Sequence, residues 1–120
     1  MPERSLRVWL VDIRTEIAGI RELTANVESA TFASSWGMKR AVEHGLLIIA
    51  EAAKHLPASL KATRPEVPWE KIHGLGNLLR HEYRRIDPDI LWSIITEHLG
   101  ALDAAAAALL EELDSEPPPT

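Results

Sequence analysis

The segment HGLGNLLRHEYRR, residues 73–85, gathers the side chains of this chain that are best suited to proton transfer and phosphate binding. On a helix, Asn77 and His81 lie one turn apart on the same face, and so do Arg80 and Arg84. Histidine takes and gives protons near neutral pH, and nearby arginine charges disfavour its protonated form and keep it available as a base. Arginine binds phosphate and stabilises the negative charge that develops in the transition state. The sequence therefore predicts one continuous polar surface that can act on a phosphate ester.

These groups together would suffice for metal-independent RNA cleavage. His81 would take the proton of a ribose 2'-hydroxyl, the oxygen would attack its own phosphate, and a cyclic phosphate would result. Arg80, Arg84 and Arg85 would bind the RNA phosphates. The alternative is a solvated helix face whose arginines pair with neighbouring acids, and spacing alone does not separate the two interpretations.

Two glycines interrupt the same segment. Gly74 and Gly76 would each destabilise a helix by about 1 kcal/mol relative to alanine. The run GLGNLL begins like a dinucleotide-binding fingerprint, but it lacks the third glycine and does not follow a strand, so we exclude that function. Helix propensity therefore does not account for the glycines at these two positions.

The five histidines do not predict a metal site. No pair has the i, i+4 spacing with which two rings on one helix hold zinc. We expect His44 and His55 to be solvated, and His98, which falls on an apolar stripe, to be a core or interface residue. No metal or other cofactor is expected.

Composition and charge narrow the class of protein. A chain of 120 residues fits one domain, and the absence of cysteine excludes disulfides and thiolate metal sites. The net charge of -5 argues against a broadly basic nucleic-acid-coating surface. The N-terminal run MPERSLRVWL has no signal-peptide apolar region, and no apolar run approaches the roughly 18 residues that span a bilayer. We therefore expect a soluble, cytoplasmic protein.

The elements that must position the polar surface are helices. Apolar residues recur at steps of three and four, and no segment shows the strict alternation of a strand. We predict main helices over residues 4–26, 29–55, 68–84 and 88–113, with Asp87 as the cap of the last and a short turn over residues 59–62. The fold class is thus all-α, an antiparallel bundle over residues 1–114, followed by a disordered tail over residues 115–120.

The run PWEKIHGLGNLLRHEYRRIDPDILWSII, residues 68–95, resembles the HepT-like family of HEPN-domain toxins. The family motif reads Arg-Asn, three residues, His, one residue, Tyr, then Ile-Asp and a tryptophan, and it is matched here by Asn77, His81, Tyr83, Ile86, Asp87 and Trp92. The run RAVEHGLLIIAEAAKHLP, residues 40–57, also resembles the family, so the resemblance covers most of the chain. It implies an all-helical homodimer that cleaves tRNA or mRNA without a metal ion.

One position departs from the family motif. The family's catalytic arginine should precede Asn77, and this chain has Gly76 there. Arg80 could supply the missing charge, the chain could be a natural inactive member, or Gly76 could be a substitution introduced during cloning. We favour the last two explanations together, which predict that the chain as written is weakly active or inactive.

The resemblance also implies partners. HepT-like toxins are typically encoded beside an MNT-type nucleotidyltransferase antitoxin, which transfers AMP to the tyrosine of the motif, here Tyr83. The added charge and bulk would block the site where RNA phosphate binds. In the family, two copies of the motif helix face each other and form a composite cleft, which would double a modest basic patch. The alternatives are a non-catalytic helical module that binds a nucleotidyltransferase, and a plain dimerisation domain.

Overall fold

The computed structural model describes residues 3–82, 84 and 86–115, with side chains from residue 6 onward, and all regular structure in this part of the chain is helical. The elements are α1 (Glu3–Thr24), α2 (Ser29–Ser34), α3 (Trp36–Lys54), α4 (Ala58–Ala62), α5 (Trp69–His81), α6 (Pro88–Ser93), the π-helical segment η2 (Ile94–His98) and α7 (Leu99–Ser115). The predicted all-α class is confirmed.

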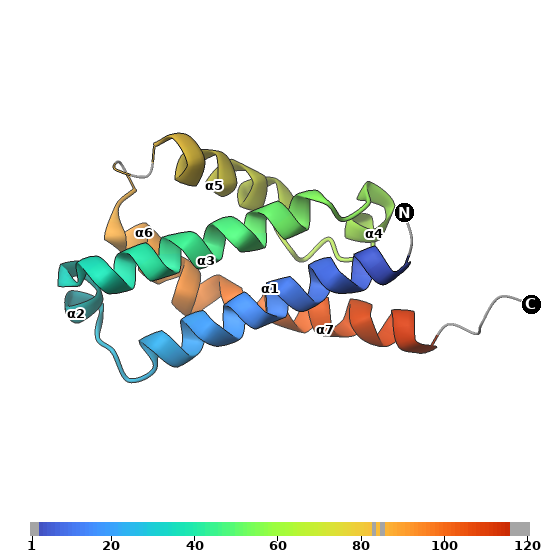
Figure 1. The fold of residues 1–120 in the computed structure, drawn as a ribbon, viewed down its shortest axis with the longest axis horizontal. Helices are drawn as coiled ribbons and strands as arrows, with labels where there is room; N and C mark the ends of the chain where they lie inside the picture. Colours follow the sequence, from blue (N-terminus) through green and yellow to red (C-terminus); the bar gives the residue numbers. More distant parts are fainter. Residues whose placement is uncertain (1–2, 83, 85, 116–120) are drawn as a thin grey trace, which may run out of the picture.

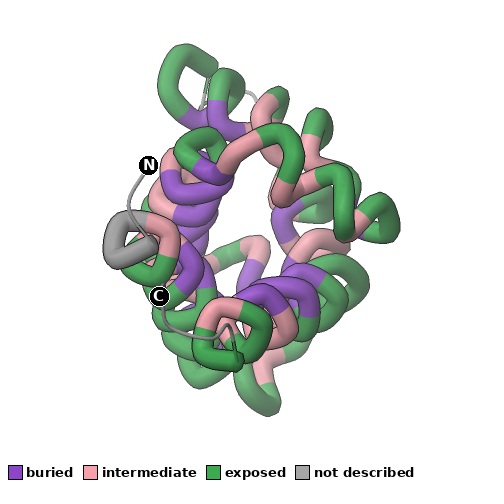
Figure 2. Tube along the Cα trace, turned by 90° about the vertical axis from the view of Figure 1, so that its right-hand side faces the viewer, coloured by how far each residue is buried: buried purple, intermediate pink, exposed green. Residues whose placement is uncertain are grey.

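The four long helices run alternately in opposite directions (Figure 1). α1 packs along α3 at the centre, α5 packs on α3 and α7 packs on α1. Viewed along the bundle, the buried residues of these helices face a common interior and the exposed residues form the outer surface (Figure 2). The arrangement is the predicted antiparallel bundle.

Much of the core comes from apolar residues that recur at steps of three and four along the long helices. α1 contributes Leu10, Ile13, Ile17 and Ile20; α3 contributes Val42, Leu46, Ile49 and Ala53; and α7 contributes Leu99, Leu102, Ala105 and Leu109, all of them buried. Burying a leucine or isoleucine side chain contributes roughly 1.5–3 kcal/mol, so these stripes fix how the helices face one another.

The prediction of one helix over residues 29–55 is wrong in one respect. The structure has two helices in this range, α2 and α3, and Ser35 separates them. This residue is extended, with φ -93° and ψ 107°, and its Oγ accepts a hydrogen bond from the backbone N–H of Met38 at 3.1 Å. Serine at this position thus caps α3. The break allows α2 to turn toward α6, where the fully buried Phe32 packs on Trp92 with ring centroids 5.3 Å apart.

The predicted helix over residues 68–84 is shorter in the structure. α5 ends at His81, since Glu82 has φ -137° and ψ 31°, outside the helical region. Arg84 therefore does not lie one turn beyond Arg80 on the same helix, which corrects the predicted continuous surface. Tyr83 and Arg85 lie outside the described residues.

The last predicted helix is continuous but not uniform. Asp87 caps α6 as predicted, with its carboxylate accepting from the backbone N–H of Asp89 at 2.9 Å. The π-helical segment η2 then changes the phase of the side chains, because its turns are wider than α-helical turns. His98 is consequently exposed rather than in the core.

The expectation that no apolar segment is long enough to span a bilayer does not hold for the C-terminal helices. The helix Pro88–Ser115 is long and apolar enough, by length and composition alone, to cross a membrane. The core helix of a soluble protein passes the same test, and Leu91, Leu99 and Leu109 of this helix are buried in the core. α7 reaches Ser115, one residue into the predicted tail, and residues 116–120 lie outside the described residues.

Candidate functional site

The site is built on α5, whose start is fixed by its first residue. The indole Nε1 of Trp69 donates to the backbone oxygens of Lys61 and Arg64 at 3.0 and 3.1 Å. Toward its end, α5 turns Gly76 and Leu79 into the core. Because an α-helix has 3.6 residues per turn, Asn77, Arg80 and His81 then lie on the exposed side of α5.

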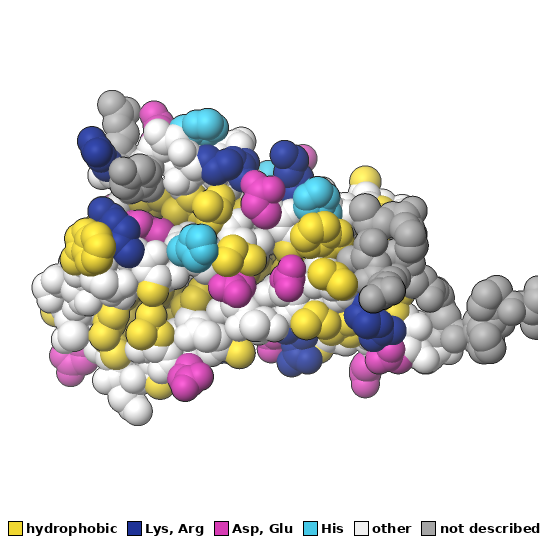
Figure 3. Space-filling model, in the orientation of Figure 1, with side chains coloured by type: hydrophobic (Ala, Val, Ile, Leu, Met, Phe, Trp, Pro, Cys, Tyr) yellow, Lys and Arg dark blue, Asp and Glu magenta, His cyan; other side chains and the backbone are white. Residues whose placement is uncertain are grey.

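Arg80 is held by two partners. Its Nη2 donates to Oδ1 of Asn77 at 2.7 Å, one turn back along α5. Its Nη1 forms an ion pair with Oε1 of Glu51, which belongs to α3. The side chains of Arg80 and Glu51 are 30% and 43% exposed, so the pair lies at the surface where a ligand can reach it. Basic, acidic and histidine side chains are intermixed on the face of the molecule that Figure 3 shows.

Gly76 is buried where α5 packs directly against α3. A Cβ atom at this position would be 2.8 Å from the Cβ of Ala50, a distance that two such atoms do not tolerate. It would also be 3.6 and 3.7 Å from Nη1 and Nη2 of Arg80. The guanidinium of Arg80 therefore lies over Gly76. At Gly74, by contrast, no atom beyond the helix lies within 4 Å of an added Cβ, and nothing in the structure explains that glycine.

His81 is the last residue of α5 and is exposed. No hydrogen bond or ion pair connects its ring with another residue in the described ranges. An exposed imidazole at the end of a helix, next in sequence to a fixed arginine, is accessible to a phosphate ester that approaches from solvent.

The structure brings together some of the predicted site residues and separates others. Gly76, Asn77 and Arg80 form one contact cluster, while Arg84 is exposed beyond the end of the helix. The motif residues Asp87 and Trp92 have structural roles, one as a helix cap and the other in packing against Phe32.

Sequence analysis did not identify Glu51 as part of the site. It lies 29 residues before Arg80 in the chain and belongs to a different helix. The only signal was its place in the run RAVEHGLLIIAEAAKHLP, and no helical spacing on α5 could indicate it.

The remaining histidines lie elsewhere. His44 is exposed, as predicted, whereas the exposed His55 also stacks on Trp9 with ring centroids 4.3 Å apart. In the first half of α5, burial lowers the pKa of His73, and the charge of Lys61 lowers it further. Within the described ranges no group of three or more histidine, aspartate or glutamate side chains could hold a metal ion.

Comparison with known proteins shows that the chain is similar to proteins named as ribonucleases. The model of a family described as ribonuclease HepT-like matches residues 13–109. A candidate RNase of Methanocaldococcus jannaschii is 32% identical over 97 residues, which cover 81% of this chain and 89% of that protein. A protein of Thermococcus cleftensis, named as a probable ribonuclease HepT, is 32% identical over 100 residues, covering 83% and 91% of the two chains. No solved structure matches.

Proposed function

The chain belongs to the HepT-like ribonuclease family, and from this we propose that it is a metal-independent endoribonuclease that cleaves tRNA or mRNA. The observation that carries the proposal is the contact between Arg80 and Asn77 directly before the exposed His81. A phosphate-binding cation therefore stands next in sequence to a group able to act as base.

The proposed reaction is transesterification within the RNA. His81 takes the proton of a ribose 2'-hydroxyl, the oxygen forms a bond to the adjacent phosphorus, and the bond from phosphorus to the 5'-oxygen of the next nucleotide breaks. Arg80 stabilises the negative charge on the phosphate oxygens, and Asn77 orients Arg80. Arg84 and Arg85 are proposed to bind flanking phosphates.

The position of Arg80 bears on the missing arginine at residue 76. Its guanidinium nitrogens lie 3.6 and 3.7 Å from the point where a side chain of residue 76 would begin, which supports the first of the three explanations, that Arg80 supplies the charge. The proposal therefore assigns activity to the chain as written, in place of the inactivity that we favoured from the sequence.

The test is RNA cleavage in EDTA. We expect the unmodified protein to cut bulk tRNA or mRNA to products with 2',3'-cyclic phosphate ends, and His81→Ala to lose about 10²- to 10⁴-fold in rate. His44→Ala, which removes an exposed histidine from α3, is the matched control and should cleave like the unmodified protein. Equal rates for the two variants would exclude His81 as the base.

The proposed active form is a homodimer in which two copies of α5 line one cleft. Leu78, which follows Asn77 on α5, and Ile90 on α6 support it, because they are large apolar residues that are 44% and 54% exposed. Large apolar side chains exposed beside a functional site are typical of surfaces that a partner covers.

The proposed regulator is an MNT-type nucleotidyltransferase that transfers AMP from ATP to the hydroxyl of Tyr83, with release of pyrophosphate. The proposal follows from the sequence motif, in which Tyr83 is two residues from His81. Co-expression with an MNT-type nucleotidyltransferase should increase the mass of the chain by whole AMP units, and Tyr83→Phe should abolish the increase. AMP on another residue would contradict the assignment.

The alternative function is a non-catalytic module that binds the nucleotidyltransferase, and glycine at position 76 favours it. Under this alternative no RNA is cut in EDTA by any variant, while the AMP transfer to Tyr83 is retained.

A further inference from the structure

We infer that Glu51 is a positioning residue that holds the guanidinium of Arg80 over Gly76, so that α3 as well as α5 builds the phosphate-binding site. The inference rests on the proposed function, which it deepens by naming how the arginine is placed. It starts from three contacts: the ion pair of Glu51 with Arg80, the hydrogen bond of Arg80 to Asn77, and the proximity of both Nη atoms to Gly76.

The helix itself determines the direction of the Arg80 side chain. Side chains on an α-helix lean toward its N-terminus, so residue 80 covers the turn that contains residues 76 and 77. Direction alone does not fix the guanidinium, because a partly exposed arginine retains several rotamers. Two acceptors, one on each side, reduce this freedom: Asn77 holds Nη2 and Glu51 holds Nη1.

The close packing of α5 on α3 brings Glu51 within reach. Gly76 faces Ala50, the residue directly before Glu51, and the absence of a Cβ at position 76 permits the approach. The same absence leaves space for the guanidinium, since a side chain at position 76 would begin 3.6 Å from Nη1. Glycine at this position thus serves the placement of Arg80.

The held guanidinium can still bind a phosphate. Arginine has five N–H donors, and the bonds to Glu51 and Asn77 use one on each Nη atom. The carboxylate also offsets part of the positive charge, so Glu51 has two opposite effects on RNA: it improves placement and weakens attraction. Placement affects kcat and attraction affects KM, which allows the two effects to be measured separately.

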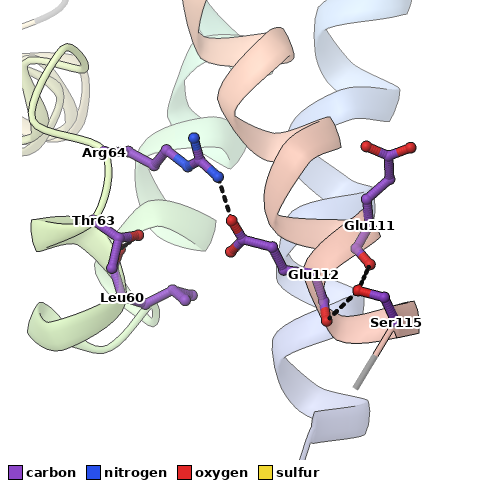
Figure 4. Close-up of polar contacts among 6 residues, drawn as sticks. All are labelled: Leu60, Thr63, Arg64, Glu111, Glu112 and Ser115. Carbon is purple, nitrogen blue, oxygen red and sulfur yellow. Dashed lines mark hydrogen bonds and ion pairs between the residues drawn. The ribbon is translucent and has the colours of Figure 1, made fainter. Parts of the chain in front are cut away.

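A second ion pair in the chain provides a matched control. Arg64 on the connection after α4 pairs with Glu112 on α7, as Figure 4 shows, and the two side chains are 25% and 55% exposed. This pair joins two elements at the surface, like the pair of Arg80 and Glu51, but involves no residue of the site. Ion pairs this exposed contribute little to stability, so removing either acid should leave the protein folded.

The first experiment measures the arginine directly and needs no enzymatic activity. Phenylglyoxal modifies accessible guanidinium groups, and peptide mass spectrometry reports the rate at Arg80. We expect Glu51→Ala to increase the rate at Arg80 several-fold, Glu51→Gln to increase it less because its amide oxygen still accepts a hydrogen bond, and Glu112→Ala to leave it unchanged. Equal rates at Arg80 in all four proteins would overturn the inference.

The second experiment measures RNA cleavage in EDTA with bulk tRNA as substrate. We expect Glu51→Ala to lower kcat about 10- to 100-fold without raising KM, Glu51→Gln to recover part of kcat, and Glu112→Ala to match the unmodified protein. An unchanged kcat with a lower KM would overturn the inference, since Glu51 would then only weaken RNA binding. Absence of cleavage in every protein would refute the proposed function, and the modification rates would still decide whether Glu51 holds Arg80.

Discussion

One residue of α5 lacks the side chain that the family motif assigns to it, and a cation stands at a nearby position that the motif leaves unspecified. Position 76 has no side chain, and the cation stands at position 80, one turn further along the helix. Because helical side chains lean toward the N-terminus, the guanidinium of Arg80 returns to the space over Gly76. The cation of residue 80 thus lies within 4 Å of the point where a side chain of residue 76 would start.

His73 is a second residue whose surroundings determine its chemistry. Its Nε2 lies 3.1 Å from Nζ of Lys61, and it is neutral imidazole that can accept from this ammonium group. Burial lowers the pKa of His73, Lys61 and Lys54 lower it further, and Glu70 opposes them. The folded state therefore disfavours protonation of His73 relative to the unfolded chain.

The predicted consequence is a loss of stability in mild acid. Where the unfolded state binds more protons, the free energy of unfolding rises with pH. The contribution of His73 should be complete above its ordinary pKa of about 6.5 and should decrease as the pH falls below that value. Urea unfolding at pH 7.5 and 5.5 should show a smaller decrease for His73→Gln than for the unmodified protein.

His44→Gln is the control for this prediction, because His44 is an exposed histidine on α3. It should retain the full pH dependence of the unmodified protein. An equal pH dependence in His73→Gln and the unmodified protein would contradict the assigned role of His73.

At the scale of elements, the packing of α5 on α3 determines which position of α5 requires glycine. α5 contains two glycines, yet only Gly76 lies against another helix. Local propensity treats the two positions alike, whereas packing distinguishes them. The same holds at Ser35, where the apolar pattern of residues 29–55 continues without interruption but Phe32 packs on Trp92 of α6, and the chain must bend to allow it.

Alanine substitutions should have opposite signs at the two glycines. Gly74→Ala should raise the free energy of unfolding by about 1 kcal/mol, since alanine favours the helix and nothing obstructs its Cβ. Gly76→Ala should lower it by roughly 1–3 kcal/mol, because its Cβ would overlap that of Ala50 and separate the helices. Urea unfolding of both variants tests this, and stabilisation by both would show that α5 is free to move away from α3.

At the scale of the whole molecule, an acidic chain must present a site to a polyanion. The net charge is -5, and the acids pair with arginines over much of the surface, as in the pairs of Arg14 with Asp103 and Arg64 with Glu112. A single α5 offers few cations. A symmetric dimer would place two such helices together and would cover the apolar side chains beside the site.

The proposed dimer leads to a prediction about one exposed side chain. Ile90→Arg on α6 should raise the dimer dissociation constant about tenfold or more in analytical ultracentrifugation, because it places a charge in an apolar contact. Val8→Arg is the control, since Val8 is 50% exposed on α1 and is not part of the site. A protein that is monomeric at micromolar concentration without substitution would exclude the composite cleft.

Much of this molecule could be predicted from its sequence because the relevant information is local. The apolar period of α1, α3 and α7 determines which faces are buried, and Asp87 before Pro88 determines where α6 begins. The motif from Asn77 to Trp92 indicated the family, since it depends on residue type and spacing within one segment. Local sequence was also sufficient to propose that a phosphate-binding surface lies on α5.

Only the tertiary structure decided how that surface is assembled. The helix α5 ends at His81, where Glu82 leaves the helical region, and the helix over residues 29–55 is broken at Ser35, and apolar spacing within these segments indicates neither boundary. The role of Gly76 depends on the distance to Ala50, and the placement of Arg80 depends on Glu51, both of them on α3. Periodicity determines which face of a helix is buried, but packing between helices determines which residues of different helices meet.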